Sequence, residues 1–285
     1  MEIKEIQAKS ILVKSNLPES DYVINCYVGC SFGCSYCYAT FMGRFVGKKV
    51  DDWGNYVYAK VNAPELLKKE LPKIKNKGRG LVILLSSVTD PFQAIEAKYK
   101  LSESCLEVLA DYGFQGTVSI LTKSPTVLKI LPILKRLKDV EVGITITTGD
   151  DQISRYFEKY APSASARIET LKKLNKAGIR TYAFLGPLLP HFVAKRDKLK
   201  EVLDLIYNTG TRELFIEHIN LSSYIKGRML KELKSEDKEF LERFYSAQSK
   251  DYREEINKII LDLLKNYKFK LLHGGVLYHK GLSKK

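Results

Sequence analysis

Tyr22-Val-Ile-Asn-Cys-Tyr-Val-Gly-Cys30-Ser-Phe-Gly-Cys34-Ser-Tyr-Cys37 is the stretch on which the interpretation of the whole chain depends. Its first part, residues 22–28, is rich in β-branched and aromatic residues, which predicts a strand. Three cysteines follow, separated by three residues and then by two. Three thiolates at this spacing, in the loop after a strand, can converge on one small metal centre.

Strand-like and helix-like segments alternate along most of the remaining chain. Gly113 and Gly178 end two expected helices, and Ser124-Pro125 supplies the N-cap and first-turn residues of another. Alternating apolar strands and helices imply parallel β-α-β units, whose sheet either stays open or curls into a partial or complete barrel with ligands at the carboxyl ends of its strands. The expected strands are residues 22–28, 81–85, 117–121, 140–147, 179–185 and 214–218, and the expected helices are 64–74, 102–112, 165–177 and one around 199–206.

Composition and charge limit the class of protein. The chain has 285 residues, 45% of them hydrophobic and 28% charged, which is ordinary globular composition. No apolar run reaches the ~20 residues that a membrane helix needs, and the first residues carry charges of both signs. We therefore expect a cytoplasmic protein without a secretory signal or membrane partner. The 47 Lys and Arg exceed the 33 Asp and Glu by 14, which favours an acidic or phosphate-bearing partner.

We expect three parts in the chain. Residues 1–19 form a short N-terminal segment, and residues 20–220 form the core with the alternating strands and helices. Residues 221–285 form a C-terminal helical extension with two amphipathic helices and an apolar tail. Because no low-complexity linker precedes this extension, we expect it to pack on the core.

The number of metal ligands separates a structural site from a reactive one. Four thiolates would complete a structural zinc site or a closed iron–sulfur cluster. Cys26 lies inside the expected strand and Cys105 on the apolar stripe of an expected helix, so we interpret both as core residues. Three ligands on a four-iron cluster leave one iron open to an exogenous ligand. A zinc knuckle needs a further ligand pair nearby, and the histidines are all far downstream, at His191, His218, His273 and His279.

The cysteine spacing after a first strand resembles the signature of the radical S-adenosylmethionine (SAM) superfamily. The resemblance implies a partial parallel (β/α)6 barrel and a [4Fe–4S] cluster held by Cys30, Cys34 and Cys37. It also implies SAM bound to the open iron, cleavage of SAM to a 5′-deoxyadenosyl radical by an external one-electron donor such as ferredoxin or flavodoxin, and hydrogen abstraction from a substrate. Within this superfamily the chain is similar to the spore photoproduct lyase-related group. The matching stretches are 25–30, 37–39, 86–93, 121–125 and 160–167.

The resemblance also implies which residues contact the cofactor. Tyr36 matches an aromatic position near the adenine, and Tyr38 lies in a matching stretch. Thr89 and Asp90, at the end of the second expected strand, resemble the element that contacts the methionine amino group. Lys123, at the end of the third, is expected to pair with the methionine carboxylate or a ribose hydroxyl. For Thr89 and Asp90, the alternative is an ordinary turn or capping role.

Four more cofactor contacts are expected farther along the chain. Thr145 and Thr147 alternate on the fourth expected strand, so they share a face, which we expect to be the one toward the ribose. Arg167, near the start of the next helix, is either a cofactor contact or one member of a surface ion pair. Leu185-Gly186-Pro187 ends the fifth expected strand, where glycine permits close approach of a backbone by adenine, or only a turn.

The catalytic residues are less clearly marked, and Ser87, Glu217 and His218 are the candidates. In spore photoproduct lyases a cysteine near the end of the second strand donates hydrogen to the product radical, and here Ser87 or a neighbour stands in that region. A serine O–H bond is much stronger than a thiol S–H bond, so we expect a different hydrogen donor, such as a tyrosine, or a different reaction. Glu217 and His218 end the sixth expected strand, and His218 is either a proton relay or a structural histidine.

Three functions remain in competition. The first is radical modification or lesion repair of a nucleic acid, favoured by 10 Lys and Arg against 4 Asp and Glu in residues 41–80, with Trp53, Tyr56 and Tyr58 between them as expected stacking residues. The second is the same chemistry on a peptide or small metabolite, although no cysteines remain for an auxiliary cluster. The third is a non-enzymatic iron–sulfur or zinc protein. The oligomeric state is left open.

Overall fold

The computed structural model describes residues 1–17, 20–233 and 238–278, which fall into two compact units. The first unit contains Met1–Gly33, Tyr38–Gly143 and Lys176–Arg180, and the second contains Cys34–Cys37, Ile144–Asn175 and Thr181–Lys285. The chain therefore passes from one unit to the other within the cysteine loop. His279 lies outside the described residues.

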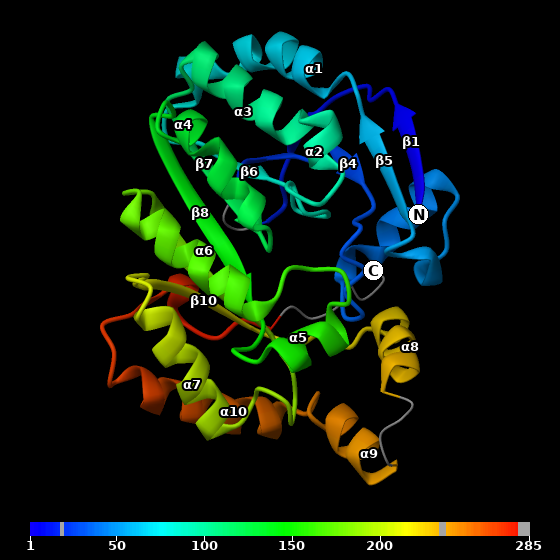
Figure 1. Ribbon diagram of the computed structural model, residues 1–285, viewed down its shortest axis with the longest axis vertical. Helices are drawn as coiled ribbons and strands as arrows, with labels where there is room; N and C mark the ends of the chain where they lie inside the picture. The colour runs from blue at the N-terminus through cyan, green and yellow to red at the C-terminus, as the bar shows by residue number, and fades with distance from the viewer. Residues whose placement is uncertain (18–19, 234–237, 279–285) are drawn as a thin grey trace. The chain divides into compact units, whose positions relative to one another are not determined.

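The first unit contains strands of two sheets (Figure 1). In the small sheet, β5 (Tyr56–Lys60) lies between β1 (Glu2–Ile6), which is parallel to it, and β4 (Tyr27–Val28), which is antiparallel. In the larger sheet, β3 (Tyr22–Ile24), β6 (Val82–Leu85) and β7 (Thr117–Thr122) are parallel neighbours in that order. At its edge, β2 (Leu12–Lys14) is antiparallel to β3.

The helices of the first unit are short apart from one. The α-helices are α1 (Ala63–Glu70), α2 (Glu96–Tyr99), α3 (Leu101–Tyr112) and α4 (Leu131–Leu134), and α1 packs against α3. The 3₁₀ segments are η1 (Tyr38–Val46), η2 (Val50–Asp52), η3 (Leu71–Lys73), η4 (Lys75–Gly78) and η5 (Pro125–Ile130).

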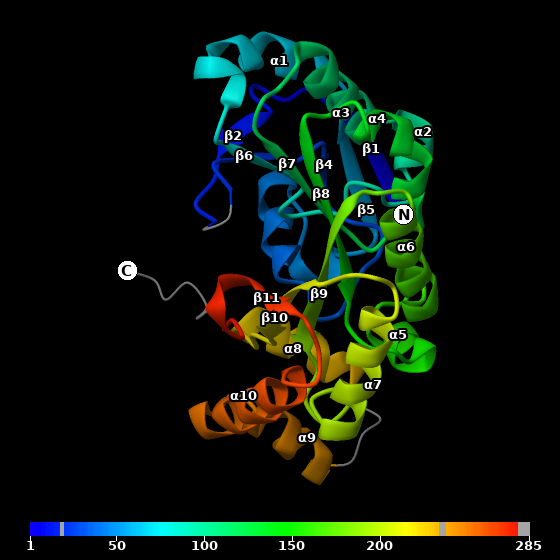
Figure 2. The same cartoon turned by 90° about the vertical axis from the view of Figure 1, so that its left-hand side faces the viewer.

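The second unit is built on parallel strands with helices between them. Strand β8 (Asp139–Ile146) enters it from the first unit, and β9 (Arg180–Leu188) is followed in the sheet by β10 (Glu213–His218) and β11 (Lys270–Leu271). Helix α10 (Lys250–Leu264) packs against α7 (Arg196–Tyr207) (Figures 1 and 2). The helices are α5 (Asp151–Phe157), α6 (Ala164–Lys176), α7 (Arg196–Tyr207), α8 (Ser223–Glu232), α9 (Lys238–Ser246) and α10 (Lys250–Leu264), and a 3₁₀ turn, η6, covers Leu272–Gly274.

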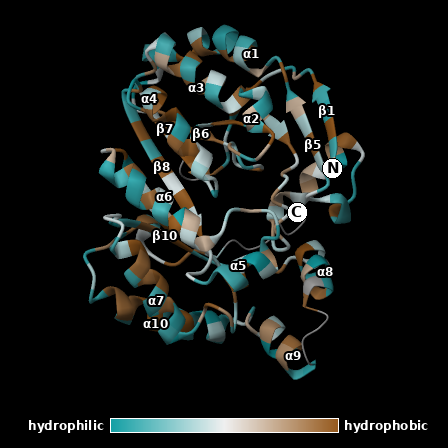
Figure 3. Cartoon of the chain, viewed as in Figure 1, coloured by the Kyte–Doolittle hydropathy of each residue, from teal (hydrophilic) through white to brown (hydrophobic). Residues whose placement is uncertain are grey.

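The predicted α/β fold with a parallel sheet is confirmed, and the apolar strands explain it. Alternate side chains of β6 and β7, including Ile83, Leu85, Val118 and Ile120, are buried, and Figure 3 shows hydrophobic residues along both strands. Gly113 ends α3 with φ +70°, as predicted. No helix in the described part of the chain is long and apolar enough to cross a bilayer.

The first predicted strand, residues 22–28, is wrong as a single strand. It breaks after Ile24 into β3 and β4, which belong to different sheets. The break lies at Asn25, whose side-chain Oδ1 accepts the backbone N–H groups of Ser87 (2.9 Å) and Val88 (3.2 Å). Strand β3 thus ends at Ile24, and β4 follows before the cysteine loop begins at Gly29.

Four other predictions need correction. The helix expected over residues 64–74 ends at Glu70 and continues as 3₁₀ turns, and the element that Ser124 caps is a 3₁₀ helix. The fifth strand does not end at Leu185–Pro187 but continues to Leu188. The C-terminal extension has three helices among its described residues rather than two, and its tail adds β11 beside β10.

The aromatic residues expected to stack on bases are buried instead. Trp53, Tyr56 and Tyr58 are 4%, 1% and 5% exposed. Their rings pack edge to face, with Trp53 and Tyr56 centroids 6.1 Å apart and Tyr56 and Tyr58 centroids 5.9 Å apart. These three residues are core, and they offer no stacking surface.

Candidate functional site

The cysteine loop consists of two backbone turns. The Cys30 carbonyl accepts the Gly33 N–H at 3.4 Å, and the Cys34 carbonyl accepts the Cys37 N–H at 3.2 Å. Cys30 and Cys34 are buried, Cys37 is partly exposed, and none of the three is in a disulfide. Gly29 starts the loop with φ +91°, and a Cβ there would lie 2.4 Å from the Tyr56 carbonyl oxygen, so only glycine fits.

The two other cysteines are core residues, as predicted. Cys26 and Cys105 are both fully buried, and their Sγ atoms lie 3.7 Å apart. The hydrogen bond with Cys26, followed by burial, raises the pKa of the Cys105 thiol, which keeps it protonated. Neither thiol has the solvent exposure of a reactive cysteine.

In the first unit, the side chain of Gln93 clamps the start of the cysteine loop. Gln93 is fully buried. Its Oε1 accepts the Ser31 backbone N–H at 2.8 Å, and its Nε2 donates to the Gly29 carbonyl (3.3 Å) and to Thr89 Oγ1 (2.9 Å). Thr89 Oγ1 in turn donates to the Gly29 carbonyl at 2.6 Å. The loop that follows β6 is thereby joined to the backbone beside Cys30.

Ser87 and Tyr38 are in contact in the first unit. Asn25 Nδ2 donates to Ser87 Oγ at 3.2 Å. The Tyr38 hydroxyl donates to the Ser87 carbonyl, while half of the Tyr38 side chain remains exposed. Tyr38 is therefore the tyrosine that the fold brings next to Ser87.

Asp90 holds the carboxyl end of β7. Its carboxylate accepts the Thr122 hydroxyl (2.7 Å), the Lys123 backbone N–H (2.8 Å) and the Phe92 N–H (2.9 Å). Burial raises the pKa of Asp90, and these three donors act in the opposite direction. The bond to Asp90 thus fixes the backbone of Lys123 at the end of β7. The role of the Lys123 side chain in SAM binding stays a prediction.

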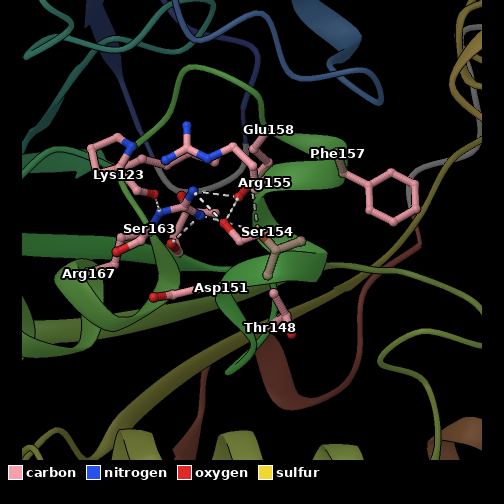
Figure 4. Close-up of polar contacts among 12 residues, drawn as sticks. Lys123, Thr148, Asp151, Ser154, Arg155, Phe157, Glu158, Ser163 and Arg167 are labelled. Carbon is pink, nitrogen blue, oxygen red and sulfur yellow. Dashed lines mark hydrogen bonds and ion pairs between the residues drawn. The ribbon is translucent and has the colours of Figure 1, made fainter.

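In the second unit, the Cys34–Cys37 segment contacts three distant parts of the chain. The Ser35 N–H donates to the Phe157 carbonyl at 2.9 Å, and Arg228 Nε from α8 donates to the Ser35 carbonyl at 3.3 Å. The Tyr36 hydroxyl donates to the Glu158 carboxylate. Figure 4 shows Glu158 at the end of α5, with its carboxylate turned toward Arg167.

Glu158 and Arg167 form an ion pair in which both side chains are fully buried. Arg167 NH2 donates to Glu158 Oε2, and Arg167 Nε donates to the Pro162 carbonyl at 2.8 Å. Burial acts to lower the pKa of Arg167, but the Glu158 charge outweighs it and the pKa is raised. Burial, followed by the Glu158 charge, raises the pKa of Tyr36. The surface ion pair considered for Arg167 is therefore wrong.

Thr147 joins this network, and Thr145 does so through its backbone. Thr147 Oγ1 donates to Glu158 Oε1 at 2.7 Å, and the Thr145 carbonyl accepts from Arg167 NH1 at 3.4 Å. Both threonine side chains are buried. Their expected contact with the ribose is not tested by these bonds and stays a prediction.

The remaining candidates lie on β9 and β10. Leu185 is fully buried, and a Cβ on Gly186 would lie 2.9 Å from the Phe184 ring and 3.2 Å from Glu217, so protein packing already accounts for that glycine. His218 is 5% exposed, and its Nε2 lies 2.8 Å from Asn257 Oδ1 on α10. Burial lowers the pKa of His218, so the ring is neutral near pH 7.

Buried hydroxyls beside the cysteine loop have unused hydrogen-bonding capacity. Ser31 Oγ, Thr40 Oγ1 and Ser86 Oγ are buried and have no hydrogen-bond partner among the described residues. Ser86 also has φ +69° at the carboxyl end of β6, which is unusual for a residue other than glycine. Among the residues that the structure describes, no three His, Cys, Asp or Glu side chains are grouped as they would be around a single metal ion.

Three residues that organise the site were not singled out from the sequence. Asn25 and Gln93 lie in stretches quoted for the resemblance, but nothing local shows that their amides bond to the loop. Nothing in the sequence around Glu158 indicates its role. The one available hint is that Arg167 and Tyr36, both expected near the cofactor, need a hydrogen-bonding partner. Only the fold brings Glu158 to Tyr36, which is 122 positions away in the chain.

Comparison with known proteins identifies the family of the chain. The model of the radical SAM superfamily matches residues 24–206. An uncharacterized protein of Methanocaldococcus jannaschii is 33% identical over 228 residues, which cover 78% of this chain and 80% of that protein.

Solved structures show the same fold at low identity. Spore photoproduct lyase complexed with dinucleoside spore photoproduct superposes with a TM-score of 0.69 at 14% identity, covering 97% of this chain and 82% of that chain. SuiB of Streptococcus suis bound to S-adenosylmethionine gives a TM-score of 0.52 at 12% identity, covering 90% and 50%. From the family match, the chain belongs to the radical SAM superfamily and is an enzyme of that type.

Proposed function

We propose that Cys30, Cys34 and Cys37 hold a [4Fe–4S] cluster and that the enzyme cleaves SAM there, after reduction by an external one-electron donor such as ferredoxin or flavodoxin. When bound, the cluster and SAM supply a 5′-deoxyadenosyl radical that abstracts hydrogen from the substrate. The observation that carries this proposal is the match to the superfamily over residues 24–206, which contain the three thiols at the family's spacing. Residues 20–220 are the catalytic core in this proposal.

The donor set fits such a cofactor. Three thiols that form no disulfide supply the soft ligands that iron–sulfur clusters take. Cys26, the candidate for a fourth ligand, is instead packed against Cys105. The buried hydroxyls of Ser31 and Ser86 have no partner in the described residues, and an unsatisfied buried polar atom is costly. A polar group of the bound cofactor would supply the missing hydrogen bonds.

The chain's own residues would then hold the cofactor in place. Lys123 pairs with the methionine carboxylate, and Thr89 and Asp90 shape the loop toward the amino group. Tyr36, Tyr38 and Leu185 border the adenine, and Thr145 and Thr147 border the ribose. Because the Arg167 guanidinium already bonds to Glu158 and to the Pro162 carbonyl, we assign it to holding Glu158 rather than to touching SAM.

A nucleic acid is the substrate class that we favour. The net charge of +14 supports a polyanionic partner, and a structural neighbour is a lyase complexed with a dinucleoside lesion. The aromatic residues that we expected to stack on bases are buried, but in the same basic segment, residues 41–80, cations in η3, in η4 and directly after η4 are exposed: Lys73, Lys75, Lys77 and Arg79. The second candidate is a peptide, because SuiB is also described bound to a precursor peptide.

The cofactor proposal is tested by anaerobic reconstitution. The wild type is expected to take up one [4Fe–4S] cluster per chain and to produce 5′-deoxyadenosine from SAM under dithionite. Cys34→Ala should lose the cluster, whereas Cys26→Ala should keep it. Loss of the cluster in Cys26→Ala would contradict the three-ligand model.

The substrate is tested by binding and by reaction. Binding to DNA or RNA should weaken steeply with added salt, while peptide binding should not. With a dinucleotide spore lesion, we expect no rapid recovery of thymines, because Ser87 cannot donate hydrogen as a thiol does. Clean repair that persists in Tyr38→Phe would refute the idea that a different donor or reaction is used.

A further inference from the structure

The Cys34–Cys37 segment is held by side chains far away in sequence. In the second unit, the hydroxyl of Tyr36, which lies between two of the cysteines, donates a hydrogen bond to Glu158. The Tyr36 side chain is 8% exposed, so this bond is shielded from water. Any shift of Glu158 is therefore transmitted to the backbone between Cys34 and Cys37.

Both oxygens of the Glu158 carboxylate are saturated with donors. Oε1 accepts Thr147 Oγ1 (2.7 Å) as well as Tyr36, and Oε2 accepts Ser154 Oγ (3.0 Å) as well as Arg167 (Figure 4). Glu158 itself is fully buried. Four donors on two oxygens allow the carboxylate only one orientation.

Arg167 helps to hold the Glu158 carboxylate in this orientation. A buried carboxylate is costly unless a cation compensates it, and Arg167 supplies that charge through a planar group that the Pro162 carbonyl also fixes. A buried ion pair is weak evidence for stability, because apolar residues of similar volume often stabilise as well. Because the Glu158 carboxylate of this pair also accepts the Tyr36 hydroxyl, the pair indicates a positioning role instead.

We propose that Glu158 is a positioning residue of the iron–sulfur site: it acts through the Tyr36 hydroxyl to fix the Cys34–Cys37 segment, with Arg167 holding its carboxylate in place. This inference rests on the proposed function, because it requires the cysteines to hold a cluster. In this proposal Glu158 acts through Tyr36 and sets the geometry of the cysteine segment, rather than contacting the cofactor itself.

The experiment compares Tyr36→Phe, Glu158→Gln and the double variant after anaerobic reconstitution. The readouts are iron and sulfide content, the rate at which a chelator removes iron, and the EPR spectrum of the reduced cluster. Tyr36→Phe should lose iron about tenfold faster and show an altered EPR spectrum. Tenfold corresponds to about 1.4 kcal/mol, close to what a hydrogen bond to a charged group contributes. Glu158→Gln should change both readouts in the same direction.

Two comparisons separate positioning from simple stability. If Glu158 acts through Tyr36, adding Glu158→Gln to Tyr36→Phe should change the EPR spectrum no further. The control is Asn175→Ala, which removes bonds to Thr181 and Thr211 in the same unit without touching the loop. It should lower the melting temperature and leave the cluster unchanged.

The outcomes are distinct. A wild type without a cluster refutes the proposed function, and this inference falls with it. A wild type with a cluster, together with variants that melt earlier but keep its EPR spectrum and iron-loss rate, refutes the positioning role alone. If Glu158→Gln does not fold, Tyr36→Phe decides, since it uncovers no buried charge.

Discussion

Replacing Gln93 with leucine tests how the first part of the cysteine loop is held. Leucine has nearly the volume of glutamine but no polar atoms, so Gln93→Leu should remove hydrogen bonds without opening a large cavity. The buried Ser31 N–H would lose its acceptor, which costs about 1–3 kcal/mol. Thr89 keeps its bond to Gly29, so the loss on that side is only about 0.5–1.5 kcal/mol. We expect the free energy of unfolding to fall by about 1.5–4.5 kcal/mol in total.

Trp53 offers a direct assay, because it is the single tryptophan of the chain and is buried in the same unit. Its fluorescence should follow urea unfolding of that unit. With a slope of about 3 kcal/mol per molar urea, the midpoint should fall by about 0.5–1.5 M. Gln115→Leu is the matched control: it removes one bond to the nearby Gly113 carbonyl and should shift the midpoint by less than half as much. Equal shifts for both variants would refute the clamp.

Three further changes have defined outcomes. Lys123→Ala should weaken SAM binding by about 10- to 150-fold, the equivalent of about 1.5–3 kcal/mol for a lost charged partner, without iron loss; unchanged binding by calorimetry would show that Lys123 is misassigned. Because burial lowers the pKa of His218, the unfolded state binds the proton first as pH falls below the ordinary value of 6.5. The unfolding free energy should therefore drop by up to about 1.4 kcal/mol per pH unit below pH 6.5, a slope that His218→Asn should lack in urea titrations at pH 7 and 5.5. Gly29→Ala forces a Cβ to within 2.4 Å of the Tyr56 carbonyl oxygen at φ +91° and should cost at least about 2 kcal/mol in the same unfolding assay; a midpoint equal to wild type would contradict the close packing.

The parallel sheet could be predicted because its signal is local. Runs such as residues 81–85 and 140–147 are apolar or β-branched over the length of one strand, and glycines mark the helix ends between them. The cysteine loop is also local, since its three thiols fall within eight residues. Features that one strand or one loop encodes by itself were therefore within reach.

What could not be predicted depends on contacts between distant residues. Trp53, Tyr56 and Tyr58 look like a surface for bases in the sequence, but they are buried in the fold. The predicted strand 22–28 breaks at Asn25, whose amide bonds to a residue 62 positions later. Side-chain hydrogen bonds of this kind leave no periodic trace in a sequence.

The bond from Arg228 to the Ser35 carbonyl bears on when the loop can be completed. The two residues are 193 positions apart, which corresponds to about 10–40 s of synthesis at ~5–20 residues per second. During that time the nascent chain has all three cysteines but lacks one of the groups that hold the segment between them. Metal delivered early would meet a loop still short of this contact, so the finished geometry becomes available only after the chain has been made as far as Arg228.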